Sequence, residues 1–232
     1  MVAAGAVSRD VRWAQTFRII RSIYPPIDLF EDIADPRDWE ALLSVEEKTN
    51  PRIRLAVGDL GKVPAHRRVS GPGSSLLMAP FVHCSTDRPG RFTDGSYGIY
   101  YAGDSEQVAL AETIHHHQSF MRATREAAGW TSDFRVLVGT IDRRLDDVNG
   151  VPGVLDPDDY RASHEEGRMR RAAGSDGLLW SSVRWSGGQC IGLFWPDVIS
   201  VPAQGRHYSY HWDGDRVDYV RQYDTGKVFS VT

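Results

Sequence analysis

The chain has 232 residues, of which 41% are hydrophobic and 25% are charged, the composition of an ordinary globular protein. That length suits one large domain, or at most two small ones, whose core needs no disulfide or metal. Lysine and arginine number 27 against 31 acidic residues, a net charge of −4, which argues against nucleic-acid binding through bulk positive charge. Cys84 and Cys190 are too few for a disulfide framework or a cysteine-rich zinc site.

No segment predicts export or membrane insertion. Met1–Gln15 contains Arg9 and Arg12 and therefore lacks the apolar centre of a signal peptide. The longest apolar run, Leu76–Val82, is interrupted by Pro80 and is far shorter than the roughly 20 residues of a membrane-spanning helix. We therefore expect a cytoplasmic protein that contacts neither membrane nor nucleic acid and requires no metal.

The first third of the chain predicts one strand and one helix. Phe17–Ile20 is typical of a short strand, which Tyr24-Pro-Pro26 ends. A helix is expected to start at Asp35-Pro36, because proline suits the first helical turn, and to run to about Thr49. Its apolar stripe consists of Trp39, Leu42 and Leu43.

The middle of the chain predicts a strand followed directly by a long helix. Tyr97–Ala102 reads as the strand, and Gly103 ends it. Asp104 or Ser105 caps the helix, and an acidic first turn agrees with the helix dipole. The helix is expected to continue to Phe120 or beyond.

The last part of the chain adds further strands and one helix. Asp156 is expected to cap a helix that has Pro157 in its first turn and runs through Glu165 to Ala173. An Asp213-Gly214 turn between alternating sequences predicts a hairpin. The strands are expected at Arg135–Ile141, Gly177–Trp180, Cys190–Trp195, Tyr208–Trp212 and Val217–Val220.

Helices and strands alternate irregularly, which predicts an α+β fold rather than a doubly wound sheet. Neither an internal repeat nor a linker long enough to separate domains is visible. The nearest candidate, Ser70–Ser75, reads as a loop. We therefore expect one domain over residues 1–232, and the absence of a Gly-x-Gly-x-x-Gly motif argues against Rossmann-type dinucleotide binding.

Three other clusters favour structural interpretations. Consecutive helical residues point about 100° apart, so His115–His117 cannot converge on one metal and reads as a partly exposed run with one inward member. His83-Cys84 would face opposite sides of a strand, which favours a buried cysteine over a nucleophile. Glu165 and Glu166 with the nearby arginines Arg168, Arg170 and Arg171 read as a solvated helix face.

One ordered set of polar residues stands apart. Arg91 follows a Pro-Gly turn, and one of Tyr100 and Tyr101 on their strand must face inward while the other faces outward. Glu112 lies on a helix with apolar neighbours, so its carboxylate is either exposed on the far face or buried with a partner. Taken singly, these residues also fit a surface ion pair, a solvated carboxylate or core packing.

Order and spacing together resemble the RES domain, a bacterial toxin family named after arginine, glutamate and serine. The resemblance covers roughly residues 15–200 and leaves an insert at about 37–75 and a C-terminal hairpin extension at about 206–232. Phe92 and Thr93 depart from the tryptophan and asparagine common in the family. The matching motifs are Phe17-Arg18-Ile19, Gly90-Arg91-Phe92, Tyr101, Ala109-Leu110-Ala111-Glu112 with His115, and Ser182 with Arg184.

The resemblance implies a fold like that of ADP-ribosyltransferases, with mixed or antiparallel sheets flanked by helices, and NAD as substrate without a metal. Glu112 is then the candidate that stabilises positive charge on the ribose, as in glycoside hydrolysis. Arg91, or alternatively Arg18, suits the pyrophosphate because a guanidinium donates two charge-assisted hydrogen bonds. Tyr101 would pack against nicotinamide, and Ser182 would orient Glu112 or a ribose hydroxyl.

The resemblance further implies a toxin–antitoxin pair, with a helix-turn-helix antitoxin of the Xre type that blocks the site and contacts DNA. The acceptor stays open between a host protein and water or phosphate, as does the choice between homodimer and hetero-oligomer. Two other functions compete: a non-catalytic interaction domain that keeps only the fold, and a hydrolase that uses Ser182 or Cys84. The hydrolase lacks a Gly-x-Ser-x-Gly elbow and an identifiable base.

Overall fold

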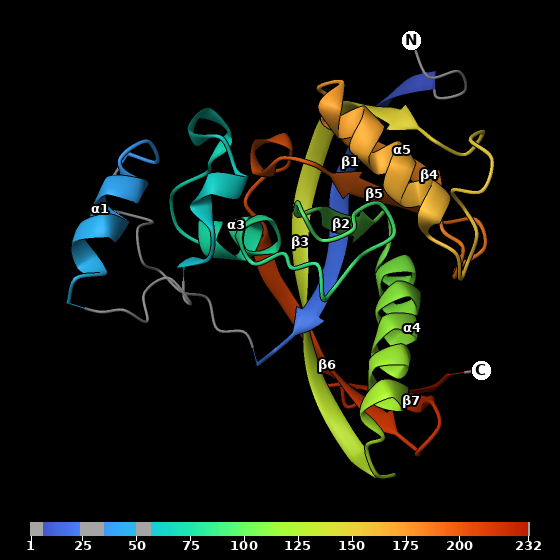
Figure 1. Ribbon diagram of the computed structural model, residues 1–232. Coiled ribbons are helices and arrows are strands. Elements are labelled where there is room, and N and C mark those ends of the chain that lie inside the picture. Colours follow the sequence, from blue (N-terminus) through green and yellow to red (C-terminus); the bar gives the residue numbers. More distant parts are fainter. Residues whose placement is uncertain (1–6, 24–34, 50–56, 232) are drawn as a thin grey trace.

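The computed structural model describes residues 7–23, 35–49 and 57–231 (Figure 1). Its helices are α1 (Trp39–Glu46), α3 (Ser74–Val82), α4 (Glu106–Thr124) and α5 (Arg161–Ala172). Its strands are β1 (Val7–Arg21), β2 (Tyr100–Gly103), β3 (Trp130–Asp147), β4 (Gly177–Ser181), β5 (Gln189–Leu193), β6 (Ala203–Trp212), β7 (Val217–Gln222) and β8 (Val228–Ser230). The α+β fold predicted from the sequence is confirmed.

All eight strands belong to one sheet in the order β1-β2-β5-β4-β3-β6-β7-β8, and β1 also pairs with β3. Because β1 pairs with both β2 and β3, the five strands β1, β2, β5, β4 and β3 close into a ring. The described pairing of β3 with β4 is parallel, and the other described pairings are antiparallel. The sheet is therefore mixed, as expected.

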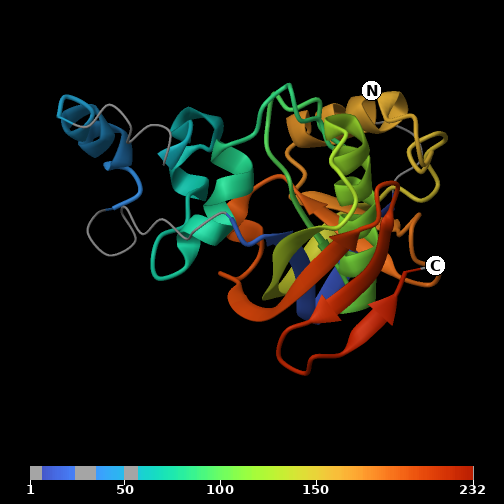
Figure 2. The same cartoon turned by 90° about the horizontal axis from the view of Figure 1, so that it is seen from below.

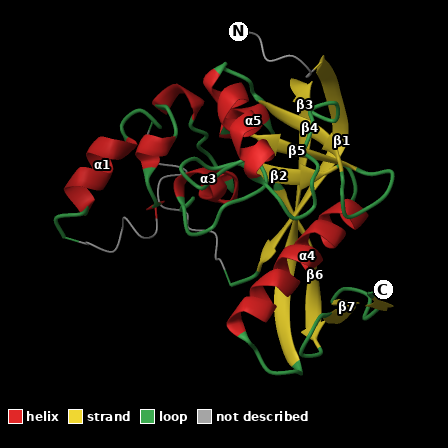
Figure 3. Cartoon of the chain, turned by 45° about the vertical axis from the view of Figure 1, so that its right-hand side comes forward, coloured by secondary structure: helices red, strands yellow, loops and turns green. Residues whose placement is uncertain are grey.

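Helix α4 lies alongside β6 and β7, which extend the sheet beyond the ring (Figure 3). Near the start of the helix, Tyr208 Oη donates to the Glu106 carboxylate at 2.7 Å. Near its end, the backbone N–H of Val217 donates to Gln118 Oε1 at 2.8 Å, and Trp212 Nε1 donates to the carbonyl of Glu126 at 3.1 Å. The C-terminal strands thus hold the helix near its start and near its end.

Helices α1 and α3 lie together on one side of the sheet (Figure 2). The buried guanidinium of Arg68 anchors α1, because it donates to the carbonyls of Pro36, Leu60 and Val63 and pairs with the Glu40 carboxylate. Apolar side chains of α3 pack into the core that also contains β1 and β5. The described part of the 37–75 insert is therefore tied to the body of the molecule.

Helix α5 packs against the 90–97 loop through Gly167. A Cβ atom at this glycine would lie 2.1 Å from the carbonyl oxygen of Phe92, so only glycine permits this approach. Glu166 is buried and pairs with Arg170 at 2.7 Å, and the Arg171 guanidinium stacks over Tyr97. The prediction of a solvated face is therefore wrong for Glu166, Arg170 and Arg171, which lie on the side of α5 that faces the protein. Glu165 and Arg168 are exposed, as predicted.

The strands predicted from the sequence exist, but their limits differ. β2 begins only at Tyr100 and includes Gly103, and β5 ends at Leu193. β1 and β3 exceed the predicted Phe17–Ile20 and Arg135–Ile141 because they pair with each other from Val7 to Arg21. The predicted hairpin is confirmed as β6 and β7 with a four-residue loop, Asp213–Arg216. The proposed strand end at Tyr24-Pro-Pro26 lies outside the described residues.

The predicted helices exist, but the residues at which two of them begin differ from the prediction. Ser105 caps α4 by accepting from the backbone N–H of Val108, as predicted. Asp35 and Asp156 do not begin helices: each carboxylate accepts backbone N–H groups two or three residues ahead and forms a turn. As a result, α1 begins at Trp39 and α5 at Arg161.

Two segments around α3 also differ from expectation. Residues 70–75 are only partly loop, because α3 begins at Ser74. His83 and Cys84 follow the end of this helix and do not lie on a strand. Cys84 is half-buried, and Lys62 Nζ donates to its backbone carbonyl at 2.7 Å.

His117 is the inward member of the histidine run, as predicted, and is 5% exposed. Burial, and secondarily the charge of Arg21, lowers the pKa of His117 from 6.5 to about 4. Since the unfolded chain protonates this imidazole near pH 6.5 and the folded chain only near pH 4, stability falls as the pH drops through this window. We expect His117→Phe to remove on the order of 3 kcal/mol of that pH-dependent loss.

Urea unfolding between pH 7 and pH 4 measures this effect. His207→Phe is the matched control, because His207 is exposed. If His117→Phe and wild type lose stability in parallel over this range, buried His117 is not the source of the loss.

Candidate functional site

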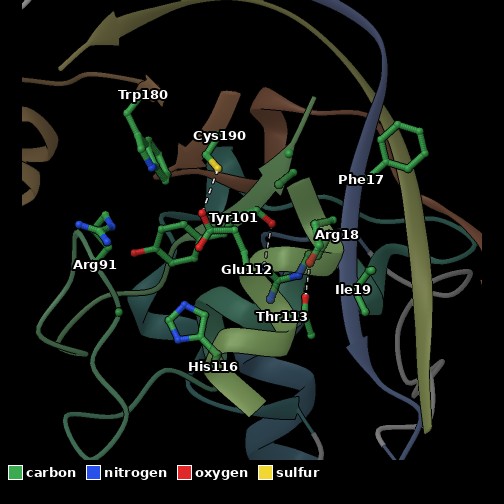
Figure 4. A pocket seen from close by; sticks show the side chains of 14 residues that line it. Phe17, Arg18, Ile19, Arg91, Tyr101, Glu112, Thr113, His116, Trp180 and Cys190 are labelled. Carbon is green, nitrogen blue, oxygen red and sulfur yellow. Dashed lines mark hydrogen bonds between the residues drawn. The ribbon is translucent and has the colours of Figure 1, made fainter. Parts of the chain in front are cut away.

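A cavity of about 230 Å³ lies between α4 and the strands of the ring (Figure 4). β1, β2, β4, β5 and α4 contribute to its wall, together with the loop before β2. The lining residues are Phe17, Arg18, Ile19, Gly90, Arg91, Tyr101, Ala102, Gly103, Ala109, Glu112, Thr113, His116, Trp180 and Cys190. The wall is therefore largely apolar, with a few charged groups.

Four of the five site residues predicted from the sequence line this cavity: Arg18, Arg91, Tyr101 and Glu112. The fifth, Ser182, is not among the lining residues but donates a hydrogen bond to Glu112. Segments far apart in the sequence thus bring these residues to one place. Which of them act on a substrate stays a prediction.

The Arg18 guanidinium keeps one unsatisfied donor. Nη1 donates to the carbonyl of Tyr101 at 3.1 Å, and the guanidinium lies 4.8 Å from the centre of the Tyr100 ring. Its Nε is buried without a hydrogen-bond partner, and no carboxylate in the described part of the chain pairs with it. Burial lowers the pKa of Arg18. An anion entering the cavity would supply the missing acceptor.

Arg91 is held by the segment that precedes α5. Its Nη1 donates to the carbonyls of Val154 at 3.2 Å and Asp156 at 2.6 Å. The guanidinium also stacks over the Tyr160 ring at 4.5 Å. Arg91 lies outside helices and strands, as predicted, yet its side chain is buried and oriented. Since these carbonyls engage only Nη1, Nε and Nη2 can serve another acceptor.

Tyr101 faces the cavity, whereas Tyr100 is fully buried in the core. This is the alternation that a strand predicts. The backbone N–H of Phe92 donates to Tyr101 Oη at 3.0 Å, and a Cβ atom at Gly90 would lie 2.9 Å from that oxygen. Burial raises the pKa of Tyr101, so its hydroxyl stays protonated. The ring is thus locked to the loop that contains Arg91.

Glu112 points from α4 towards the cavity, and Ser182 supports it from the loop after β4. Ser182 Oγ donates to Glu112 Oε1 at 2.9 Å. It accepts in turn from the backbone N–H groups of Arg184 at 3.2 Å and Trp185 at 3.1 Å. Glu112 is half-buried with Ser182 as its partner, so the structure favours the second of the two alternatives predicted for this helix carboxylate.

Several lining residues were not predicted from the sequence. The family resemblance included His115, whereas His116 lines the cavity. His116 follows Glu112 by one helical turn, and this i, i+4 spacing is the signal that places both on one face. Half-buried His115 does not line the cavity. Burial, followed by the charge of Arg184, lowers its pKa to about 4. Cys190 and Trp180 face each other across β5 and β4, which sequence alone does not pair.

The cavity offers two guanidiniums, one carboxylate and aromatic rings. Guanidiniums bind phosphate oxygens, and a carboxylate accepts from sugar hydroxyls or stabilises positive charge beside it. Within the described residues, no cluster of three or more His, Cys, Asp or Glu side chains is arranged to hold a metal. Nor does any described helix combine the length and apolar character needed to cross a membrane. The set suits an anionic ligand that contains a sugar.

Comparison with known proteins places these residues in a family context. The model of the RES domain matches residues 65–213, which include Arg91, Tyr101, Glu112 and Ser182. An uncharacterized protein of Sinorhizobium fredii (strain NBRC 101917 / NGR234), y4oC, is 29% identical over 211 residues, covering 90% of this chain and 87% of that protein. A chain in the crystal structure of the M. tuberculosis MbcT-MbcA toxin-antitoxin complex is 11% identical, with a TM-score of 0.42 over 90% of this chain and 88% of that one.

Replacing Ser182 tests whether its hydroxyl holds the site together. Ser182→Ala removes the donor to Glu112 and the acceptor of two backbone N–H groups, so we expect it to destabilise the protein by about 1–3 kcal/mol. Urea unfolding at pH 7 measures the change. Ser181→Ala is the control, because the Ser181 side chain is exposed. Equal midpoints for the two variants would contradict the assigned role.

Proposed function

The chain belongs to the RES domain family, and on this premise we propose that it is the toxin of a bacterial toxin–antitoxin pair and cleaves the nicotinamide–ribose bond of NAD. One observation carries the proposal: Arg18, Arg91, Tyr101 and Glu112, from four separate segments, line a single cavity. The order of these residues in the sequence already resembled the family, and their convergence is what an enzyme site requires.

The residues of the cavity fit NAD as a substrate. The orphaned Nε of Arg18 needs an acceptor, and a pyrophosphate oxygen is a suitable one. At about 230 Å³, the cavity is smaller than the roughly 300–1,000 Å³ that enclose a whole small-molecule ligand. We therefore expect it to enclose the nicotinamide–ribose end, while the adenosine end extends outside.

Glu112 is proposed to act on the reacting ribose. As the bond between ribose and nicotinamide breaks, the electron pair leaves with nicotinamide and positive charge develops on the sugar. A fixed carboxylate stabilises this charge more strongly in the transition state than in the ground state, which is what accelerates the reaction. The Ser182 hydroxyl keeps the carboxylate in place at 2.9 Å.

The arginines and Tyr101 are proposed to bind rather than to react. Arg91 is held with Nη1 on two carbonyls, so its free edge is oriented before NAD arrives and loses little entropy on binding. Arg18 supplies a second positive charge. Tyr101 offers an aromatic face to the nicotinamide ring, and its hydrogen bond to Phe92 limits its movement.

The acceptor of ADP-ribose is a host protein side chain, or it is water or phosphate. Incubation of the purified protein with labelled NAD and a bacterial lysate separates these outcomes. A labelled protein band indicates transfer, whereas free ADP-ribose or its phosphate indicates NAD depletion. The proposed partner is an antitoxin with an Xre-like helix-turn-helix domain, which blocks the cavity and supplies the DNA contact.

Expression without a partner tests the proposal as a whole. A toxin that consumes NAD arrests growth while cellular NAD falls. Harmless expression with unchanged NAD would favour a non-catalytic interaction domain with the same fold. Separate expression of the Glu112→Ala variant, compared with wild type, shows whether growth arrest depends on this site.

Glu112→Ala is expected to lower NAD turnover by at least about 100-fold, the scale of losing a key electrostatic group. The reason is loss of charge stabilisation at the ribose. Chromatographic measurement of released nicotinamide gives the rate. Glu165→Ala, which removes an exposed carboxylate from α5, serves as control. Full activity in Glu112→Ala would end the assignment.

Arg91→Ala should chiefly weaken NAD binding and raise KM about 10- to 100-fold, because charge-assisted hydrogen bonds to phosphate are lost. Arg88→Ala is the matched control, an exposed arginine three residues earlier. Initial rates over a range of NAD concentrations separate KM from kcat. An unchanged KM in Arg91→Ala with a raised KM in Arg18→Ala would transfer the pyrophosphate role to Arg18.

A further inference from the structure

The two carboxylate oxygens of Glu112 have different surroundings. Oε1 accepts from Ser182 Oγ at 2.9 Å and lies 3.7 Å from Cys190 Sγ, within reach of a weak sulfur hydrogen bond. Figure 4 shows the thiol of Cys190 directed at this carboxylate. Among the described residues, none donates a hydrogen bond to Oε2 or forms an ion pair with it. One oxygen is therefore held from two sides.

The Ser182 contact has a defined direction. Its Oγ already accepts from the N–H groups of Arg184 and Trp185, so both hydroxyl lone pairs are engaged and the proton is left for Glu112. The backbone of the loop is itself closed by the N–H of Ser182, which donates to the carbonyl of Gly188 at 2.9 Å. The hydroxyl thus approaches Oε1 from a fixed loop.

Cys190 approaches the same oxygen from β5, and its place is also fixed. The strand pairs Cys190 with Trp180 on one side and with Gly103 on the other. The residue is 4% exposed. Burial, and secondarily the negative charge of Glu112, raises the pKa of the thiol well above its ordinary range. At neutral pH the sulfur keeps its proton, so it meets the carboxylate as a donor and not as a thiolate.

We infer that Cys190 is a positioning residue for Glu112: its thiol and the Ser182 hydroxyl together hold Oε1 and leave Oε2 for the ribose. This inference rests on the proposed function, in which Glu112 contacts the sugar. A carboxylate held at one oxygen cannot rotate freely about its last bond. Its other oxygen therefore keeps one position for the developing charge, and such preorganisation is what electrostatic catalysis requires.

The alternative is that Cys190 only fills space. It packs in an apolar cluster with Trp180 and Val108, and a small buried cysteine often behaves as an apolar residue. A space-filling role depends on volume, whereas a positioning role depends on the S–H donor. Serine and alanine at this position separate the two, because only serine keeps a donor.

An infrared measurement of the S–H stretch tests the hydrogen bond itself. In a Cys84→Ser background Cys190 is the only thiol of the chain. A hydrogen bond lowers the S–H stretching frequency. We therefore expect a second substitution, Glu112→Ala, to move the band to higher frequency. Glu165→Ala is the control and should leave the band in place. An unchanged band in Glu112→Ala overturns the inference.

Circular dichroism shows whether Glu112→Ala is folded. If it is not, Glu112→Gln takes its place, because the amide keeps the shape but loses the negative charge that attracts the donor. The band should then move in the same direction by a smaller amount. A band at the wild-type frequency in this variant overturns the inference equally.

Kinetics test the role in catalysis. Cys190→Ala should lower kcat about 5- to 10-fold with KM for NAD within about twofold, because a misplaced reacting group affects the chemical step. Cys190→Ser should stay within about threefold of wild-type kcat. Cys84→Ala is the control, since Cys84 lies outside the cavity. Equal losses in the serine and alanine variants overturn the positioning role.

The two measurements separate this inference from the proposed function. If the wild-type protein consumes no NAD, the proposed function fails, and with it the catalytic role of Cys190. A shifted S–H band in Glu112→Ala would still support the hydrogen bond. If NAD is consumed but Cys190→Ser loses as much kcat as Cys190→Ala, only the positioning role of Cys190 fails.

Discussion

The pairing of β1 on both of its edges is the constraint on which the rest of the structure depends. One edge of β1 pairs with β3 from Val7 to Arg21, and the other edge meets β2 where Phe17 faces Gly103. This double pairing closes the ring and brings Arg18 within 3.1 Å of the Tyr101 carbonyl, although 83 residues separate them. Without β1, the cavity would lose one wall and one of its two guanidiniums. The RES domain match begins at residue 65, so β1 contributes to the site from outside the matched region.

The second constraint is the support of α4 by the C-terminal strands. Glu112 lies between two anchored ends of this helix: Tyr208 holds Glu106 near the start, and Val217 binds Gln118 near the end. The apolar face of the helix packs against β1 and β6 through residues such as Ala109 and Met121. The C-terminal hairpin, which resembled an extension to the family core, is therefore part of what positions the carboxylate.

The sequence predicted the elements of this fold better than their limits. Strands and helices follow from local apolar patterns, so β4, β5, α4 and the hairpin were found. The true lengths of β1 and β3 depend on their mutual pairing, which is a tertiary fact. Asp156 does not cap a helix, because its carboxylate accepts from the N–H groups of Asp158 and Asp159 in a turn. The buried Glu166–Arg170 pair looked solvated because a charge pattern does not reveal that Gly167 lets the helix approach Phe92.

The candidate site likewise contains residues that the sequence predicts and residues that depend on tertiary pairing. Arg18, Arg91, Tyr101, Glu112 and Ser182 were singled out by order and spacing, and the fold brings them together. Cys190 and Trp180 were missed because their place depends on the register of β5 against β4 and β2.

The unsatisfied Nε of Arg18 supports the proposal that this cavity binds a ligand. A buried donor without a partner costs about 1–3 kcal/mol, and a bound ligand is one way in which such a group is satisfied. A carboxylate beside Arg18 would satisfy Nε, but it would also compete with any incoming anion for the guanidinium. Arg91 is held in another way. Neutral carbonyls accept from its Nη1, and no carboxylate in the described part of the chain forms an ion pair with it. In both cases the protein orients an arginine without neutralising it. Positive charge therefore remains on one side of the cavity while Glu112 supplies negative charge on another, and a ligand that combines phosphate with a sugar about to become cationic matches that division.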